Sequence, residues 1–446
     1  MGKERKGKYM NKMSIVFSGE QQTLLKIMET SNQNMGITGK PGTGKSETLK
    51  QFVEHTEKKV VVLAFTGVAA LNVGGQTIHS FFRLDPKINF VEELQLDKMR
   101  PYLKDLLKKI DTIIIDEISM VPPNLLDIID TMCKYATGVS SSFGGIQLIC
   151  FGDLYQLLPI VTDDYVKSRL KKEYGEVLFY KAHAFENDNF IDDNSLKVYE
   201  LNKVFRQSDE RFKNILNEVR LGTVSQESLD ILNKRVITGD VKENIVTLAT
   251  NNEIVNSINK SKLDELRSKE FIYKAKVEGN ISSKQYPNDE ELHLKVGSQI
   301  MMLINDKLGR WVNGTMGVVS SLKDDEIKVI IDNTEYTIEK YTWENSKYVL
   351  NNGEFSQEII GKFEQYPLKL AWAITIHKGQ GQTYKSVLID LGTGAFATGQ
   401  TYVALSRCTS LETLYLRRPI KFSDITVNQE VVDFMKRVEV IELGSE

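Results

Sequence analysis

A glycine-rich loop near the N-terminus constrains this chain more than any other feature. Residues 39–46 read GKPGTGKS, a complete G-x-x-x-x-G-K-[ST] pattern, between the apolar stretch NMGIT and the helix-forming stretch SETLKQFV. Glycines let backbone N–H groups wrap a polyphosphate, and the N-terminus of the next helix adds a positive dipole end. A glycine-rich turn without a nucleotide needs no such flanks, so the strand–loop–helix order predicts a phosphate site in an α/β fold.

Two acidic residues complete this phosphate site. The stretch TIIIDEISM is an apolar strand that ends in Asp116 and Glu117. We expect Lys45 to neutralise charge on the β- and γ-phosphates, while Ser46 and Asp116 bind Mg²⁺. Glu117 can polarise the water that attacks the γ-phosphate, so the chain is predicted to hydrolyse a nucleoside triphosphate. The predicted nucleotide contacts of the loop are Gly39, Pro41, Gly42, Thr43, Gly44, Lys45 and Ser46.

Length and charge limit the remaining possibilities. A chain of 446 residues is too long for one hydrophobic core and is expected to divide into several domains. Its net charge of −3 gives no overall attraction to nucleic acid, so any such site must be a local channel. The three cysteines form no C-x-x-C pair, which argues against zinc and against a disulfide framework. No apolar run approaches the length of a membrane span, so we expect a cytoplasmic protein without a membrane partner.

The pattern of apolar residues divides the chain into two α/β parts and one β-rich part. NMGIT, KVVVLAF, DTIIIDE and IQLICFGD are continuous apolar runs, typical of parallel strands buried on both faces. A second such series starts near Val198 with VYELNKVFRQ and resumes at KSVLIDL and TLYLRR. The intervening stretch GVVSSLKDDEIKVIIDNTEYTIEKYTW alternates and turns at Asp332 and Asn333, which indicates a small antiparallel barrel or sheet.

These patterns predict the domain boundaries. We expect a flexible basic tail at residues 1–13 and a first α/β domain at residues 14–190. A second α/β domain is expected at residues 191–308 and 367–440, interrupted by a β-rich insertion at residues 309–366. Amphipathic stretches between the apolar runs predict crossover helices, so both α/β domains should contain parallel sheets.

Two arginines of the second α/β part are candidates for the same nucleotide. Arg206 lies in KVFRQ, and Arg407 lies in YVALSR behind what reads as a buried helix face. An unpaired buried charge costs roughly several kcal/mol, so Arg407 needs an anionic partner. No guanine-reading N-K-x-D tetrapeptide occurs, which argues against a GTPase switch. Arg407 could be an intersubunit finger of the clamp-loader type, but a second α/β domain favours contact within one chain, across a cleft that closes on ATP.

Three further stretches carry groups suited to a single nucleic-acid strand. AFTGVAALN places Thr66 and Gly67 behind the second strand, where hydroxyl and N–H groups can contact a phosphodiester backbone. GQTIHSFFRL and AWAITIHKGQGQTY add polar and aromatic groups for phosphates and unpaired bases. The candidates from these two stretches are Thr77, His79, Phe82, Thr375, His377 and Lys378. Taken singly, each histidine and the Phe81–Phe82 pair would more often be part of a core.

Gln21, which precedes the loop in FSGEQQTLL, has two interpretations. Its side-chain amide matches the N6/N7 edge of adenine. Together with Ser18 it also forms an S-x-x-Q capping box for the helix that follows. The residues alone leave both interpretations open.

Read in chain order, the motifs resemble those of superfamily-one DNA helicases. The stretches are FSGEQQ, GKPGTGKS, AFTGVAA, GQTIHSF, IIIDEISM, GDLYQLLPI, NKVFRQ, AWAITIHKGQGQT and YVALSR. More narrowly they resemble the PIF-type (petite integration frequency) family of the 5′→3′ branch, which is related to RecD-like helicases. The resemblance extends from about residue 17 to residue 416, and TIHSF, GDLYQLLP and TIHKGQGQT are its specific parts.

This resemblance implies two RecA-like motor domains in tandem, with a small SH3-like insertion in the second. It implies an ATP- and Mg²⁺-dependent motor that moves 5′→3′ on single-stranded DNA and unwinds forked or tailed duplexes. Members commonly unfold G-quadruplex DNA, and roles in repair, recombination and telomere maintenance would follow.

The resemblance also implies roles for particular residues. Gln21 would contact adenine, Gln156 would sense the γ-phosphate, and Gly381 would border the phosphates. Arg206 and Arg407 would be arginine fingers. A wedge element that separates duplex strands would lie at about residues 82–100, with Phe82 contributing to it.

Two positions depart from the family pattern, and three alternatives remain. Phe65 replaces the proline usual in APTG, which changes the stiffness of the backbone there, and Leu158 replaces a proline in QLPP. The long N-terminal region of some eukaryotic relatives is missing, so we expect a minimal monomeric motor of bacterial or phage type, associated with the nucleoid.

The alternative functions are a RecD-like recombination subunit, an RNA-directed translocase and an ATP-gated DNA clamp. The presence of Glu117, Arg206 and Arg407 argues against the clamp, because a clamp needs no residues for hydrolysis.

Overall fold

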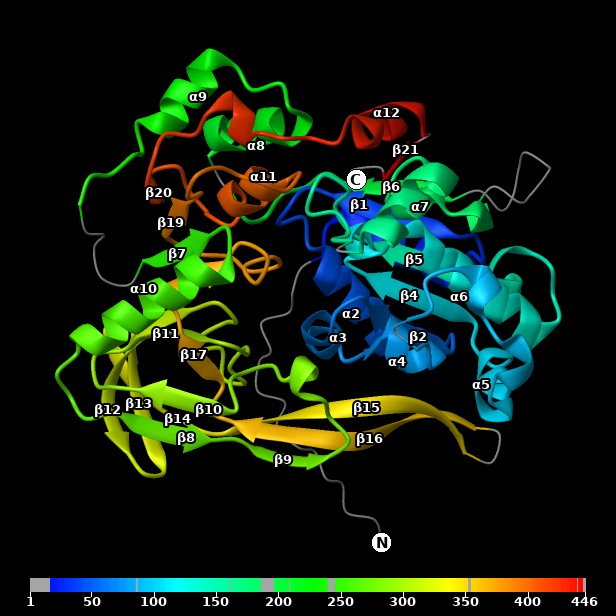
Figure 1. Ribbon diagram of the computed structural model, residues 1–446, viewed down its shortest axis with the longest axis horizontal. Coiled ribbons are helices and arrows are strands. Elements are labelled where there is room, and N and C mark those ends of the chain that lie inside the picture. Colours follow the sequence, from blue (N-terminus) through cyan, green and yellow to red (C-terminus); the bar gives the residue numbers. More distant parts are fainter. Residues whose placement is uncertain are drawn as a thin grey trace, which may run out of the picture.

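The computed structural model describes residues 17–85, 87–161, 163–185, 196–207, 209–239, 245–351, 354–438 and 440–443. The predicted basic tail at residues 1–13 lies outside this range. Figure 1 shows two α/β domains side by side and a β-rich region that extends beneath both. Within the described residues, no helix combines the length and apolarity that crossing a bilayer would require.

The first α/β domain is built on a parallel sheet of seven strands in the order β21-β6-β1-β5-β4-β2-β3. The strands are β1 (Met35–Gly39), β2 (Val60–Ala64), β3 (Gln76–Thr77), β4 (Thr112–Asp116), β5 (Gln147–Phe151), β6 (Lys197–Leu201) and β21 (Val440–Glu442). All residues of the central strands β1, β4 and β5 are buried. This burial explains their continuous apolar sequences and confirms the parallel sheet predicted from them.

Seven α-helices connect these strands or lie beside them. They are α1 (Gly19–Thr30), α2 (Lys45–His55), α3 (Gly67–Asn72), α4 (Ile78–Phe82), α5 (Pro101–Leu107), α6 (Pro123–Thr137) and α7 (Asp164–Tyr174). The 3₁₀ turns of the described chain are η1 (Val91–Glu93), η2 (Leu96–Lys98), η3 (Ile118–Met120), η4 (Ser142–Gly145), η5 (Phe179–Lys181), η6 (His183–Phe185), η7 (Ser283–Gln285) and η8 (Phe422–Asp424).

The second α/β domain has a four-stranded parallel sheet in the order β18-β7-β19-β20. Its strands are β7 (Val246–Ala249), β18 (Ala373–Thr375), β19 (Val387–Asp390) and β20 (Leu414–Leu416). Its helices are α8 (Glu210–Leu221), α9 (Gln226–Asn233), α10 (Asn252–Glu265) and α11 (Gln400–Leu405). Helix α12 (Gln429–Arg437) packs against the first domain, where the ring of Phe434 stacks on Tyr180 with centroids 3.7 Å apart. The chain therefore has the two tandem RecA-like domains that the sequence predicts.

The predicted start of the second domain at residue 191 is too early. Strand β6 pairs in parallel with β1, and the C-terminal strand β21 pairs with β6, so both belong to the first sheet. The apolar run VYEL indicates a strand but carries no information about its lateral neighbour. Backbone hydrogen bonds to Met35–Gly39 decide that neighbour.

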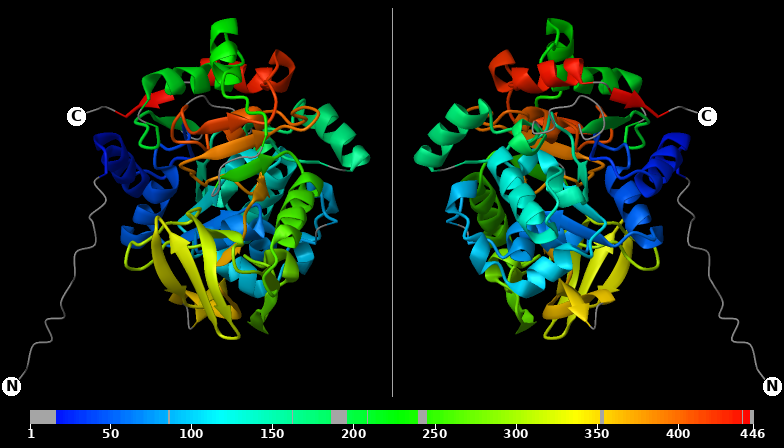
Figure 2. Two further views of the ribbon diagram at one scale, coloured as in Figure 1. Left: turned by 90° about the vertical axis from the view of Figure 1, so that its left-hand side faces the viewer. Right: turned by 90° about the vertical axis from the view of Figure 1, so that its right-hand side faces the viewer.

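The β-rich region is larger than the predicted insertion at residues 309–366. It contains β8 (Phe271–Lys274), β9 (Lys276–Gly279), β10 (Glu291–Leu294), β11 (Gln299–Met302), β12 (Met316–Lys323), β13 (Glu326–Ile331), β14 (Thr334–Ile338), β15 (Tyr341–Asn351), β16 (Glu354–Gln365) and β17 (Leu368–Leu370). A five-stranded antiparallel sheet has the order β14-β13-β12-β11-β17, and β10-β8 and β15-β16-β9 form smaller sheets. Figure 2 shows this region at the bottom of the molecule in both side views. The predicted turn at Asp332 and Asn333 is confirmed, because both have positive φ and join β13 to β14.

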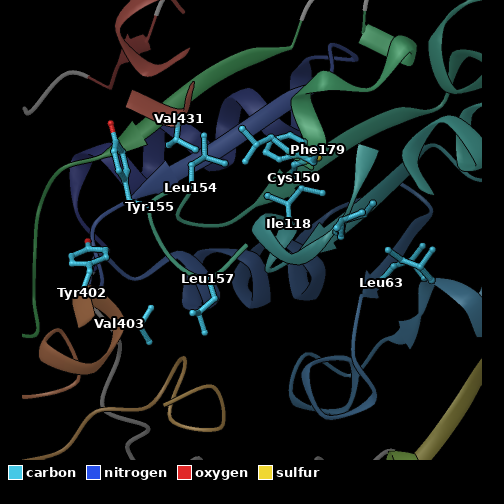
Figure 3. Packing of buried hydrophobic residues seen from close by; sticks show 14 of the residues in the cluster. Leu63, Ile118, Cys150, Leu154, Tyr155, Leu157, Phe179, Tyr402, Val403 and Val431 are labelled. Atoms are coloured by element: carbon cyan, nitrogen blue, oxygen red, sulfur yellow. The ribbon is translucent and has the colours of Figure 1, made fainter. Parts of the chain in front are cut away.

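Apolar and hydrogen-bonded contacts connect the first domain to the rest of the chain. Leu154 and Leu157 of the first domain belong to the same apolar cluster as Tyr402 and Val403 of α11, as Figure 3 illustrates. The long hairpin β15–β16 reaches back to the first domain. There the N–H of Val62 donates to the hydroxyl oxygen of Tyr348 at 2.9 Å.

Candidate active site and nucleic-acid contacts

A cavity of about 510 Å³ lies where the two α/β domains meet. The first domain lines it with Gln21, Pro41, Gly42, Gly44, Lys45, Ser46, Glu47, Asp116, Glu117, Gly152, Asp153 and Gln156. The second domain lines it with Phe205, Arg206, Gly381, Thr383 and Arg407. The structure therefore brings the predicted nucleotide residues together, except that Gly39 and Thr43 of the loop do not line the cavity.

The loop at residues 39–46 takes a shape that requires glycine. Gly42 and Gly44 have φ values of 85° and 83°, which favour glycine strongly. A Cβ at Gly42 would come within 2.4 Å of the Cβ of Arg206, so the loop could not approach the second domain with a larger residue. Lys45 begins α2, and its Nζ donates to the carbonyl oxygens of Gly39 at 2.6 Å and Lys40 at 3.2 Å. Burial lowers the pKa of Lys45, and an anion beside it would favour its charged form.

The two acids lie where β4 ends. Burial and the charge of Glu117 raise the pKa of Asp116 to about 7, and burial also raises the pKa of Glu117. Glu117 has a left-handed backbone with φ 51°, a conformation that non-glycine residues rarely adopt outside constrained sites. The Asp116 carboxylate and the Ser46 hydroxyl provide oxygen ligands of the kind that Mg²⁺ prefers, and a divalent cation would offset the repulsion between the acids. The site therefore fits the predicted metal.

The two predicted arginines lie inside the same cavity. Arg407 is only 1% exposed, and its guanidinium donates to the carbonyl of Val403 at 3.0 Å and the hydroxyl of Ser406 at 2.9 Å. Burial and the like charge of Arg407 lower the pKa of Arg206 to about 9. Neither arginine forms an ion pair with any residue that the structure describes. A buried cation, Arg407, and a partly buried one, Arg206, thus face the phosphate loop of the same chain without an ion-pair partner among the described residues, which is how an anion site is built.

Gln156 is held by residues that sequence reasoning missed. Its side-chain amide donates to Asp153 Oδ2 at 3.2 Å, and the Tyr402 hydroxyl donates to the same oxygen at 3.1 Å. Arg220 of α8 lies 3.8 Å from Asp153 Oδ1, and its guanidinium is stacked 4.2 Å from the ring centroid of Tyr155. Asp153 stands in the quoted stretch GDLYQLLPI, but its partners lie far away in the sequence. No local signal identifies them.

The capping-box interpretation of Gln21 is confirmed, and the adenine contact stays a prediction. Its side-chain oxygen accepts from the backbone N–H of Ser18 at 3.0 Å, which completes the capping box of α1. Its side-chain nitrogen donates to Thr48 Oγ1 at 3.0 Å, and the residue still lines the cavity. Beside it lies Phe205, which is 51% exposed and offers an aromatic face that sequence reasoning missed.

The predicted backbone contacts of the first domain cap two short helices. Thr66 Oγ1 accepts from the N–H of Ala69, and Thr77 Oγ1 accepts from the N–H of Ser80. Neither hydroxyl donates a hydrogen bond to any residue that the structure describes. Ala64 at the end of β2 pairs with Thr77 at the end of β3. Thr66 follows Ala64 by two residues, so both threonines lie at the same edge of the sheet. A Cβ on Gly67 would come within 3.1 Å of Gln285, so this position has room only for glycine beside η7, although the residue stays partly exposed.

The two remaining aromatic candidates, His79 and Phe82, differ in how far their rings are exposed. His79 is half-buried, and its ring lies edge-on to Phe65 with centroids 6.2 Å apart. Phe82 is 1% exposed and packs edge-on against Phe81 inside the first domain. The prediction that Phe82 stacks on bases or forms a wedge is therefore wrong, because a fully enclosed ring offers no face to a nucleotide. Its helix turns the side chain into the core.

The candidates of the second domain lie at the carboxyl end of β18. Thr375 is buried, and its Oγ1 accepts from the N–H of Lys378 at 3.2 Å. The Nε2 atom of His377 is buried and has no hydrogen-bond partner among the described residues. Lys378 is exposed. Among the described residues, the turn thus carries an exposed lysine without an ion pair and a buried imidazole nitrogen without a hydrogen-bond partner.

Comparison with known proteins gives a consistent result. Residues 16–230 match the family model described as PIF1-like helicase. The chain is 32% identical to the ATP-dependent DNA helicase Pif1 of Bdellovibrio bacteriovorus, across 95% of this chain and 93% of that protein. It is 31% identical to the human ATP-dependent DNA helicase PIF1, across 89% of this chain and 60% of that protein.

Solved structures of a Bacteroides Pif1 helicase are similar in fold. The unliganded form has a TM-score of 0.85 at 34% identity, and it covers 95% of this chain and 97% of that chain. The complex with ADP-AlF4 has a TM-score of 0.86 at 35% identity with the same coverage. The form bound to single-stranded DNA has a TM-score of 0.67 at 35% identity, again with the same coverage.

Proposed function

This chain belongs to the PIF1-like helicase family and is an ATP-dependent DNA helicase, and from that premise we propose that it moves 5′→3′ along single-stranded DNA. It separates forked or tailed duplexes ahead of it and also unfolds G-quadruplex DNA. One observation carries the proposal: the buried Arg407 and the partly buried Arg206 of the second domain share a cavity with the phosphate loop of the first, and neither has an ion-pair partner among the described residues. Closure of that cavity around ATP and its reopening after hydrolysis change the spacing of the two domains.

The side chains around the cavity have different roles in hydrolysis. Lys45 leaves the loop carbonyls to bind the β- and γ-phosphates, and Ser46 and Asp116 hold Mg²⁺, which neutralises phosphate charge when bound. Glu117 orients the attacking water and accepts its proton. Arg206 and Arg407 stabilise the charge that develops in the transition state.

Other residues set the position of the nucleotide. Gln156 contacts the γ-phosphate while Asp153 holds its side chain in place. The adenine ring lies between Gln21 and the exposed face of Phe205, which both line the cavity and approach Gly44 of the loop. Gly381 has φ 79° and no Cβ, so the backbone of the second domain can come close to the phosphates.

Two sets of contacts grip the DNA strand, one on each domain. Thr66, Gly67, Thr77 and His79 hold it on the first domain, and Thr375, His377 and Lys378 hold it on the second. Each closure of the cavity shifts one set relative to the other by moving the domains. Because all the nucleotide residues come from one chain, a monomer suffices for movement. Such a motor acts on chromosomal DNA, in the cytoplasm at the nucleoid of a bacterial or phage-infected cell.

The polarity of unwinding tests this proposal directly. We expect a duplex with a 5′ single-stranded tail to be unwound and an otherwise identical duplex with a 3′ tail to stay intact. Strand separation is measured as the loss of quenching between a fluorophore and a quencher on opposite strands, at the same salt and ATP concentrations for both substrates. Unwinding of the 3′-tailed substrate alone would refute the proposed direction, and unwinding only along an RNA tail would favour an RNA-directed translocase.

Lys378 is expected to contribute to DNA affinity through charge. Neutralising one phosphate of a single strand contributes a slope of about −0.7 to the dependence of log affinity on log salt. Lys378→Ala should therefore make the slope shallower by less than one unit and should blunt the stimulation of ATP turnover by DNA. The measurement is fluorescence anisotropy of a labelled single strand over a range of salt.

Lys385 provides the matched control for that measurement. It is an exposed lysine of the same domain, but its Nζ is paired with Asp332 at 3.0 Å. Lys385→Ala should leave the salt slope unchanged. An unchanged slope in Lys378→Ala as well would show that Lys378 makes no phosphate contact.

A further inference from the structure

Gln380 makes a hydrogen bond that the mechanism above does not use. Its side-chain nitrogen donates to Glu117 Oε2 at 3.0 Å. The two residues belong to different domains, because Gln380 follows β18 of the second sheet and Glu117 follows β4 of the first. The bond therefore ties the residue that orients the attacking water to the domain across the cleft.

The turn that carries Gln380 also carries the DNA contacts of the second domain. The N–H of Gly379 donates to the carbonyl of Thr375 at 3.0 Å, and the N–H of Gln380 donates to the carbonyl of His377 at 3.1 Å. With the bond from Lys378 N–H to Thr375 Oγ1, these contacts make the turn compact. A DNA phosphate that displaces the backbone at Lys378 therefore also shifts Gln380, two residues away.

The two ends of this turn face different surroundings. Lys378 is exposed, whereas Gln380 is half-buried beside Glu117. A carboxylate oxygen that accepts an amide N–H has less electron density and fewer free lone pairs for a water molecule. One carboxylate oxygen of Glu117 is thus already hydrogen-bonded to the side chain of Gln380.

We propose that Gln380 is a positioning residue that restrains Glu117 while the DNA contacts are empty and releases it when a strand binds. The inference rests on the proposed function, in which Glu117 orients the attacking water and Lys378 contacts DNA. It explains how a strand held outside the cavity can accelerate hydrolysis inside it. Gln380 would not touch ATP and would act only through Glu117.

The test replaces Gln380 with methionine, which keeps the length and most of the volume but removes the donor. A hydrogen bond to a charged group is strong enough for its loss to change a rate by about tenfold or more. We expect turnover without DNA to rise by about tenfold in Gln380→Met, while turnover at saturating single-stranded DNA and the KM for ATP stay within about twofold of wild type. The ratio of stimulated to basal turnover should therefore collapse.

Gln382→Met is the matched control. Gln382 lies in the same turn, but its side-chain oxygen lies toward Gly314, where an added Cβ would come within 2.8 Å of it. Its substitution should change neither basal nor stimulated turnover. In the double variant with Glu117→Gln, the raised basal turnover of Gln380→Met should disappear, because the gain depends on Glu117.

The possible outcomes separate this inference from the function on which it rests. A parallel fall of basal and stimulated turnover in Gln380→Met would show that Gln380 orients Glu117 productively, and the proposal would be wrong. Unchanged turnover under both conditions would show that the bond has no role, and the proposal would again be wrong. If wild-type turnover did not respond to single-stranded DNA, the coupling in the proposed function itself would fail.

Discussion

Replacing Arg407 with alanine is expected to lower ATP turnover by roughly a thousandfold while the protein still folds and binds both ATP and DNA. The guanidinium lies in the cavity with Lys45 and Glu117, where it can stabilise the charge on the transferring phosphoryl group. Steady-state phosphate release at saturating single-stranded DNA measures the loss. Arg417, an exposed arginine of the same domain, provides the control, because Arg417→Ala should retain turnover close to wild type.

The same variant decides whether the finger acts within one chain. Because Arg407 lines the cavity of its own phosphate loop, turnover per chain should not depend on protein concentration. Mixing Arg407→Ala with Lys45→Ala should not restore activity, since neither chain then has a complete site. Recovery of turnover in the mixture would indicate a finger supplied by a neighbouring chain, as in clamp-loader-like ATPases.

Glu117→Gln is expected to lower turnover by about a hundredfold or more without weakening nucleotide binding. The substitution keeps the shape of the side chain and leaves Asp116, Ser46 and Lys45 in place, but it removes the group that accepts a proton from water. Rapid-quench measurement of the chemical step and titration with a fluorescent ATP analogue separate the two effects. A collapse of nucleotide affinity with little change in the chemical step would show that Glu117 is structural.

The sequence predicts the nucleotide site well because its parts are local. The loop at residues 39–46 needs glycines with positive φ, a lysine at the start of α2 and a strand before it. Each of these requirements can be recognised from the residue types within a few positions of the loop. Asp116 and Glu117 follow a strand that is buried on both faces and therefore continuously apolar. Parallel strands bring such ends to one edge of a sheet, so the meeting of loop and acids follows from the pattern.

The distant partners of these residues could not be predicted in the same way. Asp153, Arg220 and Tyr402 meet in a buried polar cluster, although each residue alone reads as an ordinary loop or helix position. The bond between Gln380 and Glu117 depends on how closely two domains approach each other. Backbone propensity and hydrophobic periodicity report only a residue's own element, so they cannot specify such contacts.

The class of fold, the phosphate loop with its acids, and Arg206 and Arg407 as candidates for the same site could all be predicted from the sequence. Only the tertiary structure decided that β6 and β21 complete the first sheet, because a strand's neighbours depend on hydrogen bonds between distant segments. Only the tertiary structure also decided the role of Phe82. The stretch TIHSFF is compatible with a stacking surface and with a core helix, and the direction in which α4 packs encloses the ring. Burial depends on the residues that pack around a side chain in the assembled domain, so it cannot be predicted from a short aromatic motif.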